Sequence, residues 1–149
     1  MADLKALSRR WIEEGYGRRD ASVMEELMPL QMLEESSWRE QIAAFHGAFP
    51  DLTATIDQQL AEGDRVMTRV TFRGNHTGDL LGLPPTGKPI ELAIVEVHAW
   101  RDGQIAELWN SFHPVLVLAQ LGVVAAPDWQ AHPVTSRAQR SSGSHRTDC

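Results

Sequence analysis

The sequence is almost free of cysteine, has no long apolar run and carries no excess of basic residues, and each absence removes a class of protein. The only cysteine among 149 residues is Cys149, so neither an internal disulfide nor a cysteine metal cluster can form, and we expect a reducing compartment. No apolar run is long enough to span a bilayer, and the N-terminal residues lack the apolar core of a signal peptide. These absences predict a soluble, cytoplasmic protein.

The charge balance is acidic, with 14 Lys and Arg against 20 Asp and Glu and a net charge of −6. Surfaces that bind nucleic acid or anionic membranes need clustered basic residues, so neither is an expected partner. No two histidines stand four residues apart, as a helical metal site would need, and we expect no metal. The Gly-rich stretch 82–87 opens into a strand and not a helix, which argues against a phosphate loop.

Helical periodicity fills the first third of the chain. Apolar residues recur at helical spacing over residues 3–15, and Gly15 and Gly17 are expected to stop that helix. Ser22 with Glu25 fits a capping box that begins a short second helix, which Pro29 ends. Residues 36–48 are predicted to form a third helix.

From about residue 52 the apolar period changes to two, which is typical of strands. Strands are predicted at residues 52–60, 65–73, 90–101 and 104–113, and the first should direct one row of side chains inward: Leu52, Ala54, Ile56, Gln58 and Leu60. Asp102-Gly103 predicts a type I′ hairpin turn, because both of its central residues need positive φ. A short helix, 115–121, follows. Helices followed by an antiparallel meander predict an α+β fold, with a curved, antiparallel or mixed sheet wrapped around the N-terminal helices.

One folded domain is expected over residues 1–126. From 127 to 149 the chain is rich in Ser, Arg, His, Thr, Gln and Pro, and it has too little apolar surface to offset the entropy lost on ordering. We therefore predict a disordered C-terminal tail.

Short motifs carry a resemblance to a known family, and they are Phe49-Pro-Asp-Leu52, Glu62-Gly-Asp64, Asn75-His-Thr-Gly78, Leu81-Gly-Leu-Pro-Pro-Thr-Gly87 and Asp102-Gly-Gln-Ile105 with Trp109. From about Phe45 to Gly122 the chain resembles the SnoaL-like polyketide cyclases of the nuclear transport factor 2-like superfamily. The resemblance implies their cone-shaped fold, a cystatin-like α+β barrel. These motifs indicate a scaffold and do not identify the reaction.

The resemblance also implies a function: a cofactor-free cyclase or isomerase of polyketide-derived or other natural products, such as antibiotics. In that family a side-chain base removes a proton next to a carbonyl, and the enolate attacks a second carbonyl. The resemblance further implies a homodimer, in which the convex sheet face carrying Val95, Val97 and Ala99 would contact the second subunit.

The third predicted strand places the candidate catalytic residues. Its period of two puts Glu96 and His98 on one face, and they are the only ionisable residues of an otherwise apolar row. A carboxyl group in an apolar pocket is a better general base near neutral pH than an exposed one. Pairing across the Asp102-Gly103 turn brings Asn110 opposite Glu96.

Asn110 stands where the resemblance implies an acid/base Asp. An amide cannot exchange a proton near neutrality, but it can donate a hydrogen bond to an oxyanion. We therefore assign Glu96 as base, Asn110 as hydrogen-bond donor and His98 as a second acid/base or substrate anchor. The candidate substrate-binding residues are Ile94, Trp100, Phe112, His113 and Trp11.

Other interpretations stay open. Glu96 can instead form an ion pair with Arg69 or Arg73, and His113 can be a plain surface residue. The protein can also be a drifted homologue that assists hydroxylation or opens an epoxide, or a non-catalytic small-molecule-binding or dimerisation domain. The resemblance implies a strand and loop after the second helix, and the short stretch from Pro29 to Trp38 suggests a shortened pocket wall, which favours the last reading.

Overall fold

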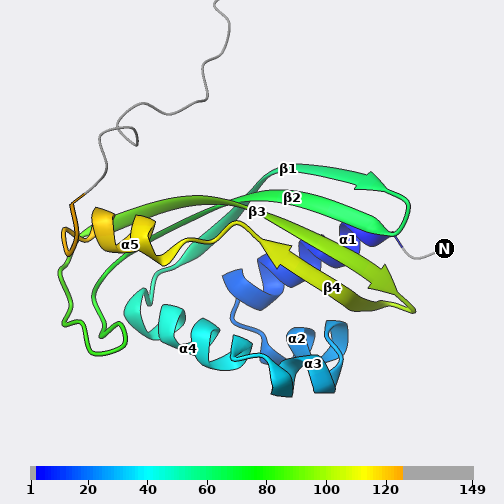
Figure 1. Cartoon of the computed structure of the whole chain (residues 1–149), viewed down its shortest axis with the longest axis horizontal. Helices are drawn as coiled ribbons and strands as arrows, with labels where there is room; N and C mark the ends of the chain where they lie inside the picture. The colour runs from blue at the N-terminus through cyan, green and yellow to red at the C-terminus, as the bar shows by residue number, and fades with distance from the viewer. Residues whose placement is uncertain (1–2, 126–149) are drawn as a thin grey trace, which may run out of the picture.

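The computed structural model describes residues 3–125, which form a curved sheet lying over a layer of helices (Figure 1). The helices are α1 (Leu4–Arg10), the π-helical η1 (Trp11–Gly17), α2 (Ala21–Leu27), α3 (Leu30–Glu35), α4 (Trp38–Ala48) and α5 (Pro114–Gln120). The strands are β1 (Thr53–Glu62), β2 (Arg65–Asn75), β3 (Pro89–Arg101) and β4 (Gln104–Asn110). The predicted tail, 127–149, lies outside the described residues.

The sheet is a four-stranded meander in the order β1-β2-β3-β4, and each strand is antiparallel to the next. This confirms the α+β class. The sheet is open and wholly antiparallel. In Figure 1 the continuous helix of α1 and η1 runs beneath its concave face, and α4 lies below the end of β4.

Alternation along β3 decides which side chains face the helices. The predicted inward row is buried throughout, and it consists of Leu92, Ile94, Glu96, His98 and Trp100. Glu91 and Ala93, on the opposite face, are exposed. The concave face therefore carries both ionisable residues of the row.

A β-bulge in β1 overturns part of the predicted inward row of that strand. Ala54 and Ile56 face the core as expected, but the register of β1 on β2 shifts between Ile56 and Gln58. One extra residue reverses the alternation, so Gln59 is the half-buried residue and Leu60 is exposed. By contrast, Asp102 and Gly103 have φ of 52° and 77°, which confirms the predicted turn.

The first helix does not stop at Gly15. It continues from α1 into the π-helical turn η1, where the backbone N–H of Arg18 donates to the carbonyl of Glu13, five residues back. Gly15 is needed for packing, since a Cβ there would lie 3.0 Å from the Met24 side chain. The π-helical turn keeps Trp11 and Tyr16 buried together.

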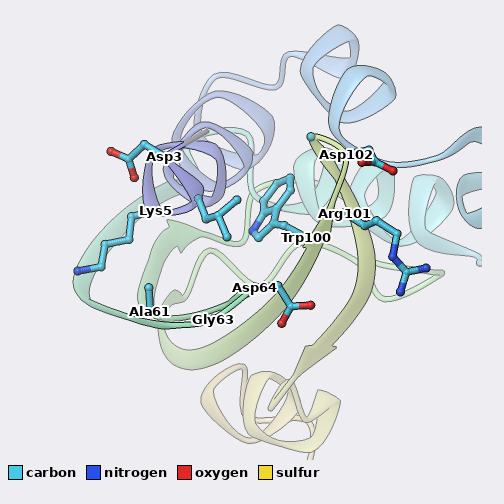
Figure 2. A pocket seen from close by; sticks show the side chains of 10 residues that line it. Asp3, Lys5, Ala61, Gly63, Asp64, Trp100, Arg101 and Asp102 are labelled. Carbon is cyan, nitrogen blue, oxygen red and sulfur yellow. The ribbon is translucent and has the colours of Figure 1, made fainter. Parts of the chain in front are cut away.

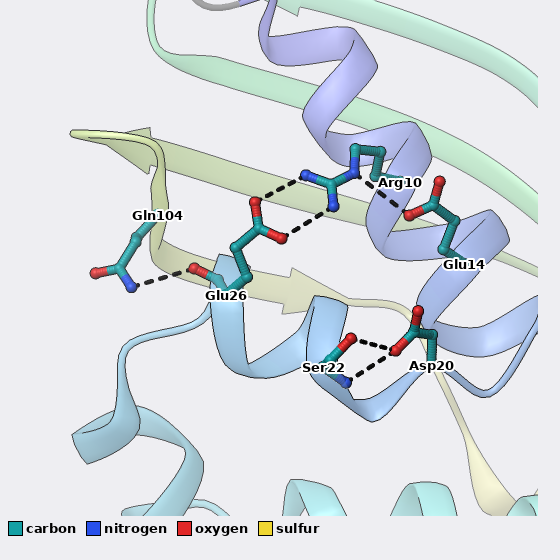
Figure 3. Close-up of polar contacts among 6 residues, drawn as sticks. All are labelled: Arg10, Glu14, Asp20, Ser22, Glu26 and Gln104. Atoms are coloured by element: carbon teal, nitrogen blue, oxygen red, sulfur yellow. Dashed lines mark hydrogen bonds and ion pairs between the residues drawn. The ribbon is translucent and has the colours of Figure 1, made fainter.

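Two details of the helix layer differ from the sequence-based expectation. The N-cap of α2 is Asp20, whose side chain accepts a hydrogen bond from the backbone N–H of Ser22; the capping box beginning at Ser22 was wrong (Figure 3). The short stretch between Pro29 and Trp38, where the resemblance implies a strand and loop, holds the six-residue helix α3.

Arg10 and Gln104 connect the helices to one another and to the sheet (Figure 3). The Arg10 guanidinium donates to both carboxylate oxygens of Glu26 at 3.0 Å and to Glu14, which ties α1 to α2. The side chain of Gln104 on β4 donates to the Glu26 carbonyl. The second helix is thereby fixed against the open edge of the sheet.

The motifs that carry the resemblance contact one another and fix the loop between β2 and β3. Asp51 accepts hydrogen bonds from the backbone and side-chain N–H groups of Asn75. The Nδ1 atom of His76 accepts from the backbone N–H of Thr86, so this histidine braces the loop. The backbone N–H of Gly78 donates to the carbonyl of Ala48, at the C-terminal end of α4. These residues therefore serve the scaffold.

Two glycines that meet at this contact provide a matched test of packing. A Cβ at Gly78 would overlap the carbonyl oxygen of Gly47, whereas a Cβ at Gly47 would meet nothing within 4 Å. We expect Gly78→Ala to lower the free energy of unfolding by about 2–4 kcal/mol, because the loop must move off α4. Gly47→Ala should raise it by about 0.5–1 kcal/mol through helix propensity. Urea unfolding measures both, and equal effects of the two would contradict the close approach.

Candidate active site

Glu96 and His98 lie in the middle of β3 and are removed from water, with 1% and 0% of their surface exposed. Their strand neighbours are apolar, and the helix of α1 and η1 covers their face. Glu96 does not form the alternative ion pair with Arg73, because Arg73 pairs with Glu91 on the convex face. Glu96 is instead held within the core.

Two donors hold the Glu96 carboxylate. The Tyr16 hydroxyl donates to Oε1 at 2.8 Å, and Oε2 lies 3.1 Å from Nε2 of His98. Both carboxylate oxygens thus have a partner, one from the helix layer and one from the same strand. A buried carboxylate needs such partners, because an unpaired buried charge is strongly destabilising.

The hydrogen-bond chain continues beyond His98 and fixes where its proton lies. Nδ1 of His98 and Nε1 of Trp100 are each 3.0 Å from the hydroxyl of Ser8. An indole N–H can only donate, so Ser8 accepts from Trp100 and its own hydrogen is free to bond to Nδ1. This arrangement assigns the ring proton to Nε2, from which His98 donates to Glu96.

Tyr16 and Ser8 are the members of this chain that the sequence analysis missed. A signal for Ser8 was present, because it is a polar residue within the apolar stripe of the first helix, between Leu4 and Trp11. Tyr16 carries no such signal, since its place on the inner face depends on the π-helical turn. Burial, the neighbouring charge of Glu96 and the hydrogen bond to it raise the pKa of Tyr16 well above its usual value.

Asn110 pairs with Glu96 across the β3–β4 ladder, as expected, so the two side chains lie on the same face. The Oδ1 atom of Asn110 accepts a hydrogen bond from the backbone N–H of Phe112 at 3.1 Å. Its amide nitrogen is therefore the group that can donate. Asn110 is half-buried, at the edge of the concave face.

The predicted substrate-binding residues fall into an inner and an outer group. Trp11 is fully buried, with its ring edge to face against His98, and Ile94 and Trp100 are also buried. Phe112 is half-buried and packs edge to face on Phe45 of α4. His113 is exposed at the start of α5, away from the chain of hydrogen bonds.

Half-buried side chains of α4, of β4 and of the segment that follows β4 form a group that we call the α4–β4 seam, in which Phe45 of α4 packs against Phe112. It consists of Trp38, Ile42, Phe45, Leu108, Asn110 and Phe112. Leu108 and Asn110 pair with His98 and Glu96, so this seam is the partly exposed border of the same concave face.

Two surface hollows of the described residues lie elsewhere. The first, about 660 Å³, lies between the N-terminus of α1 and the two hairpin turns, and Trp100 is its only member from the hydrogen-bond chain (Figure 2). Asp3, Lys5, Asp64, Arg101 and Asp102 contribute charged side chains to its rim. The second lies between α3 and the β3–β4 hairpin. Neither includes Glu96 or Asn110, so we take the seam, which borders the face that carries both residues, as the candidate site.

Residues 3–125 contain no group of three His, Cys, Asp or Glu side chains arranged to hold a metal ion. Within the same residues no helix is both long enough and apolar enough to cross a membrane.

Comparison with known proteins decides the family. The sequence profile of the SnoaL-like polyketide cyclases matches residues 7–121. The chain belongs to the SnoaL-like polyketide cyclase family. No curated protein is similar enough in sequence to count as a relative.

Solved structures of this fold agree with that assignment. The chain is similar to AclR, a proposed hydroxylase from Streptomyces galilaeus, with 26% identity, 88% of each chain covered and a TM-score of 0.70. It is also similar to IdmH, a proposed polyketide cyclase from Streptomyces antibioticus, with 29% identity, 81% of this chain and 99% of that chain covered, and a TM-score of 0.68. A SnoaL-like protein from Jannaschia shares the fold at 22% identity, with coverage of 83% and 93% and a TM-score of 0.67.

Because Tyr16 is the only tyrosine of the chain, its ionisation can be followed directly by ultraviolet absorbance. The raised pKa means that the native state favours the neutral phenol, so this contribution to stability is present below pH 10 and is lost as the pH rises further. We expect ionisation well above pH 10, or only as the protein unfolds. Glu96→Gln should lower the pH midpoint of Tyr16 ionisation. The midpoint should still lie above pH 10, because burial is a larger cause of the raised pKa than Glu96. A wild-type midpoint near pH 10 would contradict the buried pair.

Proposed function

We propose that this protein catalyses a cofactor-free cyclisation or isomerisation of a polyketide-derived intermediate, by acid–base chemistry at the α4–β4 seam. The observation that carries the proposal is the buried Glu96 carboxylate, held by Tyr16 and His98 and facing Asn110 across one rung of the sheet. Buried ionisable groups on a concave, mostly apolar face are typical of active sites. Membership of the family supports the substrate class.

The proposed reaction is redox-neutral. Glu96 takes a proton from the carbon next to a carbonyl, and the Asn110 amide donates to the oxygen that becomes negative. The enolate carbon forms a bond to a second carbonyl carbon, whose oxygen receives the proton that Glu96 took. His98 donates a hydrogen bond to Glu96 and holds it in position. No oxidant is consumed, and the product has the mass of the substrate.

The role of Glu96 can be tested against a matched carboxylate on the other face. We expect Glu96→Gln to lower kcat about 10²–10⁴-fold on polyketide diketones that close by intramolecular aldol reaction, because the base is lost. Chromatography separates the product from its isomeric substrate. Glu107→Gln, an exposed residue that pairs with Arg65, should leave the rate unchanged. Unaltered turnover in Glu96→Gln would show that the proposed base is wrong.

A second candidate function is assistance to hydroxylation or epoxide opening. Two observations favour it, namely the amide at Asn110 and the 26% identity to AclR. Under this second hypothesis, Asn110→Asp restores the proton-exchanging group expected at that position. A gain of aldol activity in the variant would indicate that this protein is a cyclase whose chemistry has changed. Ligand binding by the wild type without turnover of either kind would favour a binding domain.

The convex face supports the proposed homodimer. One rung across all four strands places Leu60, Met67, Val97 and Trp109 side by side, and the first, second and fourth are 52%, 42% and 57% exposed. Ala99, expected to be part of this surface, is buried beneath the ion pair of Arg65 and Glu107. An apolar row of this kind is typical of a subunit interface.

Sedimentation at micromolar concentration tests the dimer. We expect the wild type to sediment as a dimer and the double variant Met67→Lys/Trp109→Lys as a monomer, because two charges would be buried at the interface. Leu81→Lys, in the β2–β3 loop and 87% exposed, is the control and should remain dimeric. A monomeric wild type would contradict the proposal.

A further inference from the structure

Two stacked tryptophans next to the hydrogen-bond chain have indole N–H groups without an acceptor. The rings of Trp11 and Trp38 lie 6.2 Å apart at an interplanar angle of 26°, and both contact Tyr16. In residues 3–125 the buried side-chain nitrogen or oxygen atoms without a hydrogen-bond partner are Nε1 of each of these tryptophans and Nε2 of His76. Since buried donors are nearly always paired, such exceptions call for an explanation.

The two N–H groups differ in what they face. Trp11 packs edge to face against Tyr16, and the interaction of its indole N–H with the phenol opposes the rise in the pKa of Tyr16. Trp38 makes no corresponding contribution to the pKa of Tyr16, and its Nε1 has no hydrogen-bond partner. Trp38 is half-buried at the start of α4, within the α4–β4 seam, although its Nε1 atom itself is buried.

We propose that the Trp38 indole N–H binds a carbonyl or enolate oxygen of the substrate and orients it toward Tyr16 and Glu96. An indole nitrogen is a donor only, so its ligand must supply an acceptor. The surrounding rings of Trp11 and Tyr16 favour a planar, apolar ligand. The buried carboxylate of Glu96 and the net charge of −6 disfavour a free anion, which leaves a neutral polycarbonyl compound.

This inference rests on the proposed function for its substrate class, but binding tests it without turnover. Fluorenone and fluorene are a matched pair of neutral, planar probes, since one carries a carbonyl where the other has a methylene. Calorimetry would give the affinity of each for the wild type, for Trp38→Phe and for Trp109→Phe, whose tryptophan is exposed on the convex face. The ratio of the two affinities isolates the carbonyl contact from lost ring packing.

We expect the wild type to bind fluorenone more tightly than fluorene. In Trp38→Phe the ratio of the two affinities should fall about three- to tenfold, the usual size of one hydrogen bond. Trp109→Phe should keep it. An unchanged ratio in Trp38→Phe, or no binding of either probe to the wild type, would overturn the proposal.

The indole N–H resonances of the wild type give an independent measurement that needs no variant to fold. Fluorenone should move the Trp38 resonance downfield and fluorene should not, whereas equal shifts would contradict the contact. Glu96→Gln separates the two proposals: if it retains the fluorenone preference and also turns over substrate at the wild-type rate, only the acid–base assignment fails.

Discussion

The burial of one carboxylate, that of Glu96, is the constraint on which the arrangement of helices and sheet depends. Removing an ionised carboxylate from water costs about several kcal/mol, and the cost is offset only where donors are held in good geometry. Here one donor comes from η1 and the other from β3 itself. The helix layer and the sheet must therefore be in a fixed register, which the contacts of Ser8 extend by one further point of attachment.

The π-helical turn follows from the same requirement. Ser8 and Tyr16 are eight residues apart, and in a regular α-helix that separation leaves two side chains about 80° apart around the axis. A π-helical turn contains more residues than an α-helical one, so it reduces this difference and brings both side chains toward β3. We attribute the widened helix, which has i→i+5 hydrogen bonds, to the need for both residues to reach one buried network. A short stretch of less favourable helix is thereby retained next to the site.

The sequence predicted the scaffold better than the site, for physical reasons. The turn at Asp102 and the alternation of β3 are local properties, and they placed Glu96, His98 and Asn110 correctly on one face. The bulge in β1 has no marker residue, so the prediction that Leu60 faces inward was wrong. Helix α3 lacks a capping side chain at its start, so no local signal marked a helix in the short stretch after Pro29. Partners such as Tyr16, 80 residues from Glu96, depend on tertiary packing that no local pattern reports.

The rung that joins Glu96 and Asn110 explains why an amide is suited to position 110. Directly opposed side chains of an antiparallel pair lie close together, and two like charges there repel. Opposite the buried carboxyl group of Glu96, a carboxyl at 110 would add a second acidic group on the same face, whereas an amide offers a donor. Phe112 fixes the orientation of that amide by engaging its Oδ1 atom. In this arrangement β3 supplies the carboxylate and β4 supplies the hydrogen bond, so the amide at 110 is compatible with acid–base chemistry on the same face.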